Sequence, residues 1–218
     1  MEENTIEVVV DFESLGLGPD AVLLAVAGVA VERVSGQIVS DFSAVIDPRN
    51  QPGRTIDAGT VLWWMAQGDA ARKRITDAVK MLDDGPAPDA TEEEIDAHHE
   101  SQAIPLMHAA MAYVGWIEYL QENFGTVTKF WSQGAVDAGW VQSMLDQAGL
   151  KNPLKYWDHM DLRTALAVHP DVARVKPTVA HDALADATAQ AQTLIALHAK
   201  LDGRSLPTTE DSSNAQIH

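Results

Sequence analysis

The chain has 218 residues, of which 46% are hydrophobic and 22% are charged, and these proportions suit one globular domain with a sizeable core. It contains no cysteine, which excludes disulfides and thiolate metal sites. Its formal net charge of −17 opposes broad electrostatic binding of nucleic acid. No segment has the pattern of a signal peptide or a membrane span, so we expect a cytoplasmic protein without membrane contacts.

The first half of the chain is expected to begin with strands. Residues 6–13 contain a valine run that is typical of a central strand buried on both faces. Residues 21–34 and 37–46 are rich in β-forming residues and are separated by a Ser-Gly pair, which predicts a hairpin. Residues 60–82 then predict one or two helices, with a Gly-Asp pair as the possible break.

The next segment, residues 83–100, is strongly acidic. It holds eight acidic residues and no lysine or arginine, so it supplies −8 of the net charge. We predict a solvated loop or insertion here. Further acids elsewhere would be neutralised if they hold metal, so the acidic total weakens a nucleic-acid function without excluding it.

The second half of the chain alternates helices with strands. The pattern predicts helices near 105–125, 137–148, 161–168 and 181–201, and strands at 127–134 and 155–160. Asp182 suits the N-cap of the last helix. Together the elements predict an α/β fold, in which a mixed sheet has an antiparallel meander followed by parallel strands and is flanked by helices. We expect a single domain over 1–205, with the acidic insertion, and a disordered polar tail at 206–218.

Two carboxylates, Asp11 and Glu13, flank Phe12 at the end of the first strand. Successive strand side chains point to opposite faces, so the carboxylates should project together while Phe12 points away. Such a pair is costly in a buried position unless a cation lies between the two groups. Mg²⁺ and Mn²⁺ prefer oxygen ligands, so the pair favours a divalent metal site, although an isolated D-x-E pattern more often marks a solvated acidic turn.

Three further residues lie at element boundaries in the second half. Asp137 follows G-A-V at the exit of the strand 127–134, where ligands bind in open α/β sheets. Asp186 lies one turn into the last helix, and His181 comes just before that helix. Because five residues of an ideal helix turn by roughly 140°, we expect His181 to project from the preceding loop, over a site whose floor includes Asp186.

The order and type of these residues resemble the DEDDh superfamily of 3′–5′ exonucleases, with D-F-E near the start, an aspartate after G-A-V and H-x-x-x-x-D at the last helix. Four segments are similar to one subfamily of it, namely TVLWWMAQGDAAR (60–72), WSQGAVD (131–137), DLRT (161–164) and HDALADATAQA (181–191). That subfamily contains a phage-type exodeoxyribonuclease and a bacterial 3′–5′ exoribonuclease. The resemblance covers residues 6–200, although Asp137 follows its glycine one residue sooner than the G-x-x-x-D spacing that we expect.

The resemblance implies an RNase H-like fold and a phosphodiesterase that releases nucleoside 5′-monophosphates from the 3′ end of DNA or RNA, either single-stranded or with a 3′ overhang. It implies two Mg²⁺ or Mn²⁺ ions, about 3.5–4 Å apart, which activate water and stabilise the leaving 3′ oxygen. The metal ligands that it implies are Asp11, Glu13, Asp137 and Asp186. His181 would be the general base, since an imidazole suits proton transfer near neutral pH. The implied substrate-binding residues are Phe12, Ser14, Leu15, Trp63, Trp64 and Gln67. The relatives also suggest a homodimer and a phage source.

Other interpretations of these residues and of the whole chain stay open. Trp63 and Trp64 also suit core positions, Gln67 suits an exposed helix face, and Arg163 suits a structural pairing with a buried acid. His181 and Asp182 could instead belong to an HD-type phosphohydrolase, although that fold is all-helical and the β-rich start opposes it. The acidic total could also indicate a DNA mimic that occupies nucleic-acid-processing proteins, but nearly half of the net charge lies in one segment. The sequence does not choose between DNA and RNA.

Overall fold

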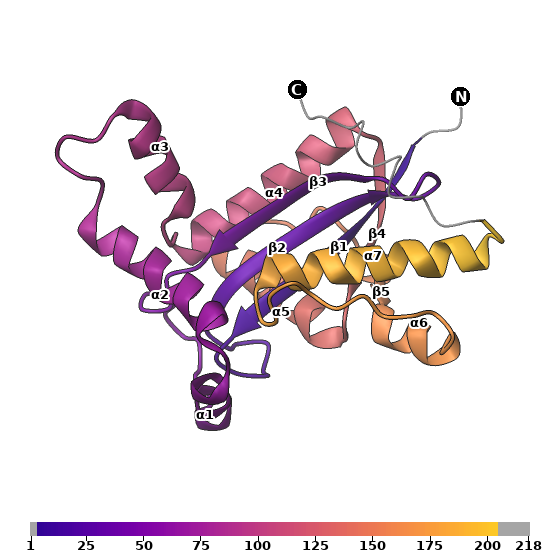
Figure 1. Cartoon of the computed structure of the whole chain (residues 1–218), viewed down its shortest axis with the longest axis horizontal. Coiled ribbons are helices and arrows are strands. Elements are labelled where there is room, and N and C mark those ends of the chain that lie inside the picture. Colours follow the sequence, from indigo (N-terminus) through magenta and orange to yellow (C-terminus); the bar gives the residue numbers. More distant parts are fainter. Residues whose placement is uncertain (1–3, 205–218) are drawn as a thin grey trace.

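The computed structural model describes residues 4–204, and a five-stranded sheet forms the centre of this part of the chain (Figure 1). In sheet order its strands are β3 (Ile38–Val45), β2 (Leu23–Glu32), β1 (Thr5–Ser14), β4 (Thr126–Ser132) and β5 (His159–Asp161). β1, β2 and β3 form an antiparallel meander, whereas β4 runs parallel to β1 and β5 runs parallel to β4. This arrangement confirms the predicted mixed sheet.

The central strand, β1, is buried on both faces. Alternate valines of β1 pack on one face with α4 (Leu106–Asn123) and α5 (Ala135–Ala148), and on the other with α6 (Leu162–Val168) and α7 (Ala183–Leu201). Each buried valine contributes about 1.5–3 kcal/mol by leaving water, which explains why the valine run becomes the middle of the sheet. The two helical layers lie on opposite faces of the sheet in Figure 1.

The segment after the hairpin forms two helices, α1 (Ala58–Ala66) and α2 (Asp69–Asp84), so the predicted break is confirmed. Asp57 caps α1, because its side chain accepts a hydrogen bond from a first-turn backbone N–H. The buried Trp64 holds α1 against the end of β1, since its indole N–H donates to the Ser14 carbonyl oxygen at 2.8 Å. This contact fixes α1 next to the D-F-E carboxylates.

The prediction of a loop over the acidic segment 83–100 is wrong for its second half, which forms α3 (Glu92–Ser101). Thr91 and Glu94 form a capping box, in which each side chain accepts a hydrogen bond from the other residue's backbone N–H. Acidic side chains in the first turn also interact favourably with the positive end of the helix dipole. No residue of α3 is buried, so this acidic helix is solvated as the composition predicts.

The elements of the second half lie near their predicted positions. The predicted strand at 155–160 is a strand only at its end, because the turn of 3₁₀-helix η1 (Tyr156–Asp158) precedes β5. Asp182 caps α7 as predicted, since its side chain accepts a hydrogen bond from a first-turn backbone N–H. The predicted tail at 206–218 lies outside the described residues. Within residues 4–204, no helix has both the length and the apolar composition that a membrane crossing requires.

Candidate active site

Asp11 and Glu13 project from one face of β1 near its carboxyl end, and Phe12 projects from the other. The Phe12 side chain is 5% exposed and packs edge-to-face with Trp140, at 6.1 Å between ring centroids, in the core beneath α4 and α5. The two carboxylates therefore share the face that α7 covers, where Val9 is the next inward-pointing residue. Strand alternation alone brings this pair together.

Asp137 approaches the same point from the first turn of α5, directly after β4. It is buried, and its Oδ1 accepts a hydrogen bond from the Phe12 backbone N–H at 3.3 Å. Asp137 thus contacts the backbone between Asp11 and Glu13 in spite of its shorter spacing from Gly134. The positive charge of the Arg163 guanidinium lies close enough to favour the ionised form of Asp137. Arg163 thus lies near a buried acid, but the two form no ion pair, so the predicted pairing stays a prediction.

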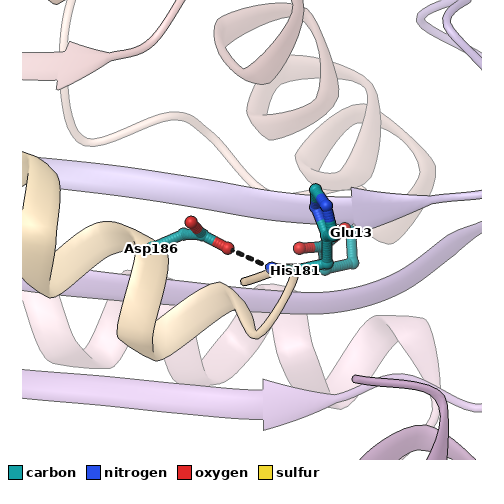
Figure 2. A group of neighbouring side chains, drawn as sticks. All are labelled: Glu13, His181 and Asp186. Carbon is teal, nitrogen blue, oxygen red and sulfur yellow. Dashed lines mark hydrogen bonds between the residues drawn. The ribbon is translucent and has the colours of Figure 1, made fainter. Parts of the chain in front are cut away.

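The third part of the site comes from the start of α7. His181 immediately precedes the helix cap and has a φ of 63°, a left-handed conformation that costs a residue with a side chain about 1–2 kcal/mol. Its backbone N–H donates to Asp186 Oδ2 at 2.7 Å, which stabilises this conformation and fixes the Asp186 carboxylate (Figure 2). The imidazole therefore projects from the loop, while Asp186 lies on the helix.

Glu13, His181 and Asp186 form the tightest group of the site (Figure 2). One ligand atom from each of them can be chosen so that all three lie within 4.8 Å of one another. Asp11 and Asp137 lie outside this group but border it, because the pKa of Asp11 responds to the charges of Asp137, Glu13 and Asp186. Four carboxylates and one imidazole thus meet where β1, α5 and α7 converge.

Burial and mutual repulsion make this cluster unfavourable when all its carboxylates are ionised. Burial raises the pKa of Glu13 to about 8, with Asp186 and Asp137 adding to the shift. Burial also raises the pKa of Asp137 to about 7, and it raises the pKa values of Asp11 and Asp186 above their ordinary range. An oxygen-rich set of this kind fits a hard divalent cation, whose charge would offset the repulsion.

The metal-free protein is expected to lose stability as the pH rises from about 6.5 to 8. In this range Glu13 is ionised in the unfolded chain, whereas the folded site, where its pKa is about 8, keeps it protonated. Unfolding then releases a proton, so the free energy of unfolding falls with pH, by up to about 1.4 kcal/mol per pH unit for one group. Melting temperatures measured in EDTA across this range provide the test.

The matched variant Glu13→Gln removes this titration and should give a flatter dependence than the wild type. The pH range begins at 6.5 because His198 has the opposite effect on stability below that value. Burial lowers the pKa of His198 to about 4, so between pH 4 and 6.5 the free energy of unfolding rises with pH. A melting temperature that rises with pH in this range, or an equal slope in Glu13→Gln, would contradict the prediction.

Of the residues that the resemblance implies to bind substrate, some lie beside the site and others are buried in the core. Trp63 is 43% exposed, and its ring meets the His181 ring edge-to-face at 4.6 Å between centroids. Phe12 and Trp64 are buried, and Leu15 packs against Trp64. The Ser14 hydroxyl donates to the Gly16 carbonyl oxygen at 2.7 Å, and the Gln67 amide donates to the Trp63 carbonyl oxygen at 3.0 Å. Trp63 is therefore the aromatic residue of this set that lies open beside the histidine.

One residue of the site, Gln190, was not found by sequence reasoning. It lies one turn after Asp186 on α7, and its side-chain N–H donates to Asp11 Oδ1 at 2.7 Å. Its own Oε1 is buried and has no hydrogen-bond partner among the described residues. Gln190 thus orients Asp11 from the helix that covers the sheet. Its i+4 spacing from Asp186 is the signal that could have identified it.

Fold and site together define a DEDDh-type nuclease, in which acids from the D-F-E strand, the middle helix and the last helix meet beside one histidine. The chain belongs to the family of Rv2179c-like 3′-5′ exoribonuclease domains, whose model matches residues 6–197. It is therefore a 3′–5′ exonuclease, and the five-stranded sheet excludes the all-helical HD alternative. The phage-type subtype and the phage source stay predictions.

Similar solved structures show the same fold. The nuclease domain of 3′hExo, a DEDDh family member bound to rAMP, is 13% identical, with a TM-score of 0.56 over 94% of this chain and 96% of that one. The zinc-bound E. coli ExoI–ssDNA complex is 12% identical, also with a TM-score of 0.56, over 90% of this chain and 41% of that one. E. coli exonuclease I in complex with a dA16 oligonucleotide is 13% identical, with a TM-score of 0.55 over the same shares. No curated protein matches the chain.

Proposed function

We propose that the protein hydrolyses single-stranded or 3′-overhang RNA one nucleotide at a time from the 3′ end, with two divalent cations and a histidine base. The observation that carries the proposal is the convergence of four carboxylates and the His181 imidazole at the end of β1. The family description, a 3′-5′ exoribonuclease domain, supports RNA over DNA as the substrate.

The proposed metal ligands are Asp11, Glu13, Asp137 and Asp186, and the ions are Mg²⁺ or Mn²⁺. All four ligands are carboxylates, the ligand type that these cations prefer. Burial raises the pKa of each of them, an effect that a bound cation would offset. When bound, such a pair of cations supplies a nucleophilic water and stabilises charge at the phosphate. Asp137 and Gln190 keep the β1 carboxylates in position, through the Phe12 backbone and Asp11 respectively.

His181 is proposed to accept the proton of the attacking water. A ring nitrogen of His181 lies within 4.8 Å of carboxylate oxygens of Glu13 and Asp186, so it borders the cluster where a water can stand between the groups. The backbone hydrogen bond to Asp186 and the T-shaped contact with the Trp63 ring hold the histidine on two sides. The open part of the Trp63 ring is proposed to stack on the terminal base.

Degradation of matched RNA and DNA oligonucleotides tests this function. With Mn²⁺ or Mg²⁺, a 5′-labelled RNA should shorten stepwise from its 3′ end and release nucleoside 5′-monophosphates, whereas EDTA should stop the reaction. Equal rates on DNA would overturn the RNA preference. Internal cleavage, or degradation that persists in EDTA, would overturn the exonuclease mechanism. The homodimer and the cytoplasmic location stay predictions beside this test.

A further inference from the structure

Cations outnumber acids in the segment of residues 151–176. This segment holds five cations and three acids, a net charge of +2, whereas the rest of the chain holds 10 cations and 29 acids, a net charge of −19. The five cations are Lys151, Lys155, Arg163, Arg174 and Lys176, and all of them are exposed. An acidic nuclease therefore has in this segment a region with the charge that a polyanion requires.

The acids of this segment are already engaged, whereas none of its five cations forms an ion pair with a described residue. Asp158 pairs with Lys129, and Asp171 pairs with Lys200, so cations from outside the segment neutralise both. The third acid, Asp161, caps α6. Among the described residues, no carboxylate oxygen lies within 4.0 Å of the side-chain nitrogens of the five cations. The local field is therefore more positive than the formal charge of +2.

Two aromatic side chains lie open in the same segment. Tyr156 is 86% exposed and Trp157 is 58% exposed, and their rings meet edge-to-face at 4.8 Å between centroids. The Lys155 ammonium lies over the Trp157 ring, 5.3 Å from its centroid. Exposed aromatic rings beside unpaired cations are the combination with which proteins hold single-stranded nucleic acid, by stacking on bases and contacting phosphates.

The segment extends away from the active site on the side opposite the acidic helix. Arg163 borders Asp137, and Lys176 lies in the loop that returns along α7 to His181. Lys176 also lines a groove of about 380 Å³ against α7. In Figure 1, α6 and α3 lie at opposite ends of the molecule. A nucleic-acid strand with its 3′ end in the site is thus attracted by the cations of residues 151–176 on one side and repelled by the acids of α3 on the other.

We propose that Lys151, Lys155, Tyr156, Trp157, Arg174 and Lys176 form one cationic surface, and that it binds the 5′ part of a single-stranded RNA whose 3′ end occupies the active site. The proposal rests on the proposed function and adds a second binding region to it. Phosphate contacts come from the lysines and Arg174, and base stacking comes from Tyr156 and Trp157. The surface explains how a protein with a net charge of −17 holds a polyanionic substrate.

The test compares charge reversal on this surface with the same reversal elsewhere. The variants are Lys155→Glu and Lys176→Glu, singly and combined, with Lys80→Glu as the matched control, because Lys80 is an exposed cation of α2 without an ion pair among the described residues. Substrates are RNA oligonucleotides of about 3 and about 12 nucleotides, the longer of which is long enough to reach a surface beyond the site.

On the long RNA, the double variant should lose about 10-fold or more in kcat/KM, mostly through KM, while the short RNA should be hydrolysed at the wild-type rate. The slope of log affinity against log salt should become shallower by about 0.7 for each phosphate that the variant no longer neutralises. Trp157→Ala should weaken binding of the long RNA in the same way, without changing the slope of log affinity against log salt. An equal loss of kcat/KM on the long and the short RNA, or an equal loss in Lys80→Glu, would overturn the proposed RNA-binding surface.

Fluorescence anisotropy of the labelled long RNA in EDTA separates this inference from the proposed function, because binding there needs no hydrolysis. Weaker binding by the double variant than by Lys80→Glu supports the surface, even if the wild type fails to shorten RNA and the proposed function falls. Equal binding by all variants overturns the surface and leaves the proposed function standing.

Discussion

Replacing Asp11 with asparagine is expected to abolish the Mn²⁺-induced rise in melting temperature and to lower the rate of hydrolysis by on the order of 10³-fold or more. The pKa of Asp11 responds to the charges of Asp137, Glu13 and Asp186, so Asp11 belongs to the same cluster. Without Mn²⁺, the same change should raise the melting temperature, because it removes one repelling charge from a buried cluster. The predicted effects thus have opposite signs with and without metal.

Asp41→Asn is the matched control, since Asp41 is an exposed aspartate of β3, outside the site. It should leave both melting temperatures and the rate near wild-type values. Differential scanning fluorimetry with EDTA and with Mn²⁺, together with the rate on a 3′-labelled RNA, measures all the quantities. If Asp11→Asn kept the Mn²⁺ response, or if the metal-free variant melted below the wild type, the proposed metal ligation by Asp11 would be wrong.

The part of the site that could be predicted depends on local rules. Strand alternation put Asp11 and Glu13 on one face and Phe12 in the core, and the capping preference of aspartate put Asp182 at the start of α7. With the start of α7 fixed, the direction of Asp186 follows from the helix period. These inferences need only a few neighbouring residues and the type of element that carries them.

The rest of the site depends on contacts between distant segments. Gln190 bonds to Asp11 across 179 residues, and although its i+4 spacing places it on the same helix face as Asp186, no local pattern specifies Asp11 as its partner. Trp63 and Trp64 are adjacent and alike, and their different exposure appears only when α1 docks through the Trp64 indole on Ser14. By contrast, the left-handed backbone of His181 is held by a local contact, its N–H bond to Asp186 five residues later.

The acidic segment shows the reverse case, in which a local signal was present and composition obscured it. Its high charge favoured a loop, yet the T-x-x-E pattern at Thr91 and Glu94 is a helix start. The charges that oppose burial do not oppose a solvated helix, because acids in the first turn stabilise its amino end. Composition predicted the exposure of α3, whereas spacing would have predicted its structure.

Removing the His181 imidazole is expected to lower the rate by about 10²–10⁴-fold, the usual contribution of a positioned base, while Mn²⁺ affinity stays near the wild-type value. His181→Gly is the sharper variant, because glycine adopts the observed φ of 63° without steric cost and keeps the backbone N–H that Asp186 accepts. His181→Ala should show the same rate loss and a lower melting temperature. Asp11→Asn provides the contrast, since it should lose metal and rate together.

Calorimetric Mn²⁺ titration and rescue by added imidazole decide between a base and a ligand. The His181 ring contributes a nitrogen to the group within 4.8 Å, so ligation is the alternative that this geometry permits. In His181→Gly, free imidazole should enter the space beside Trp63 and restore part of the rate, because it replaces a proton acceptor. It should not restore the rate of Asp11→Asn. If His181→Gly lost Mn²⁺ as fully as Asp11→Asn, His181 would be a metal ligand, and the proton of the attacking water would need another acceptor.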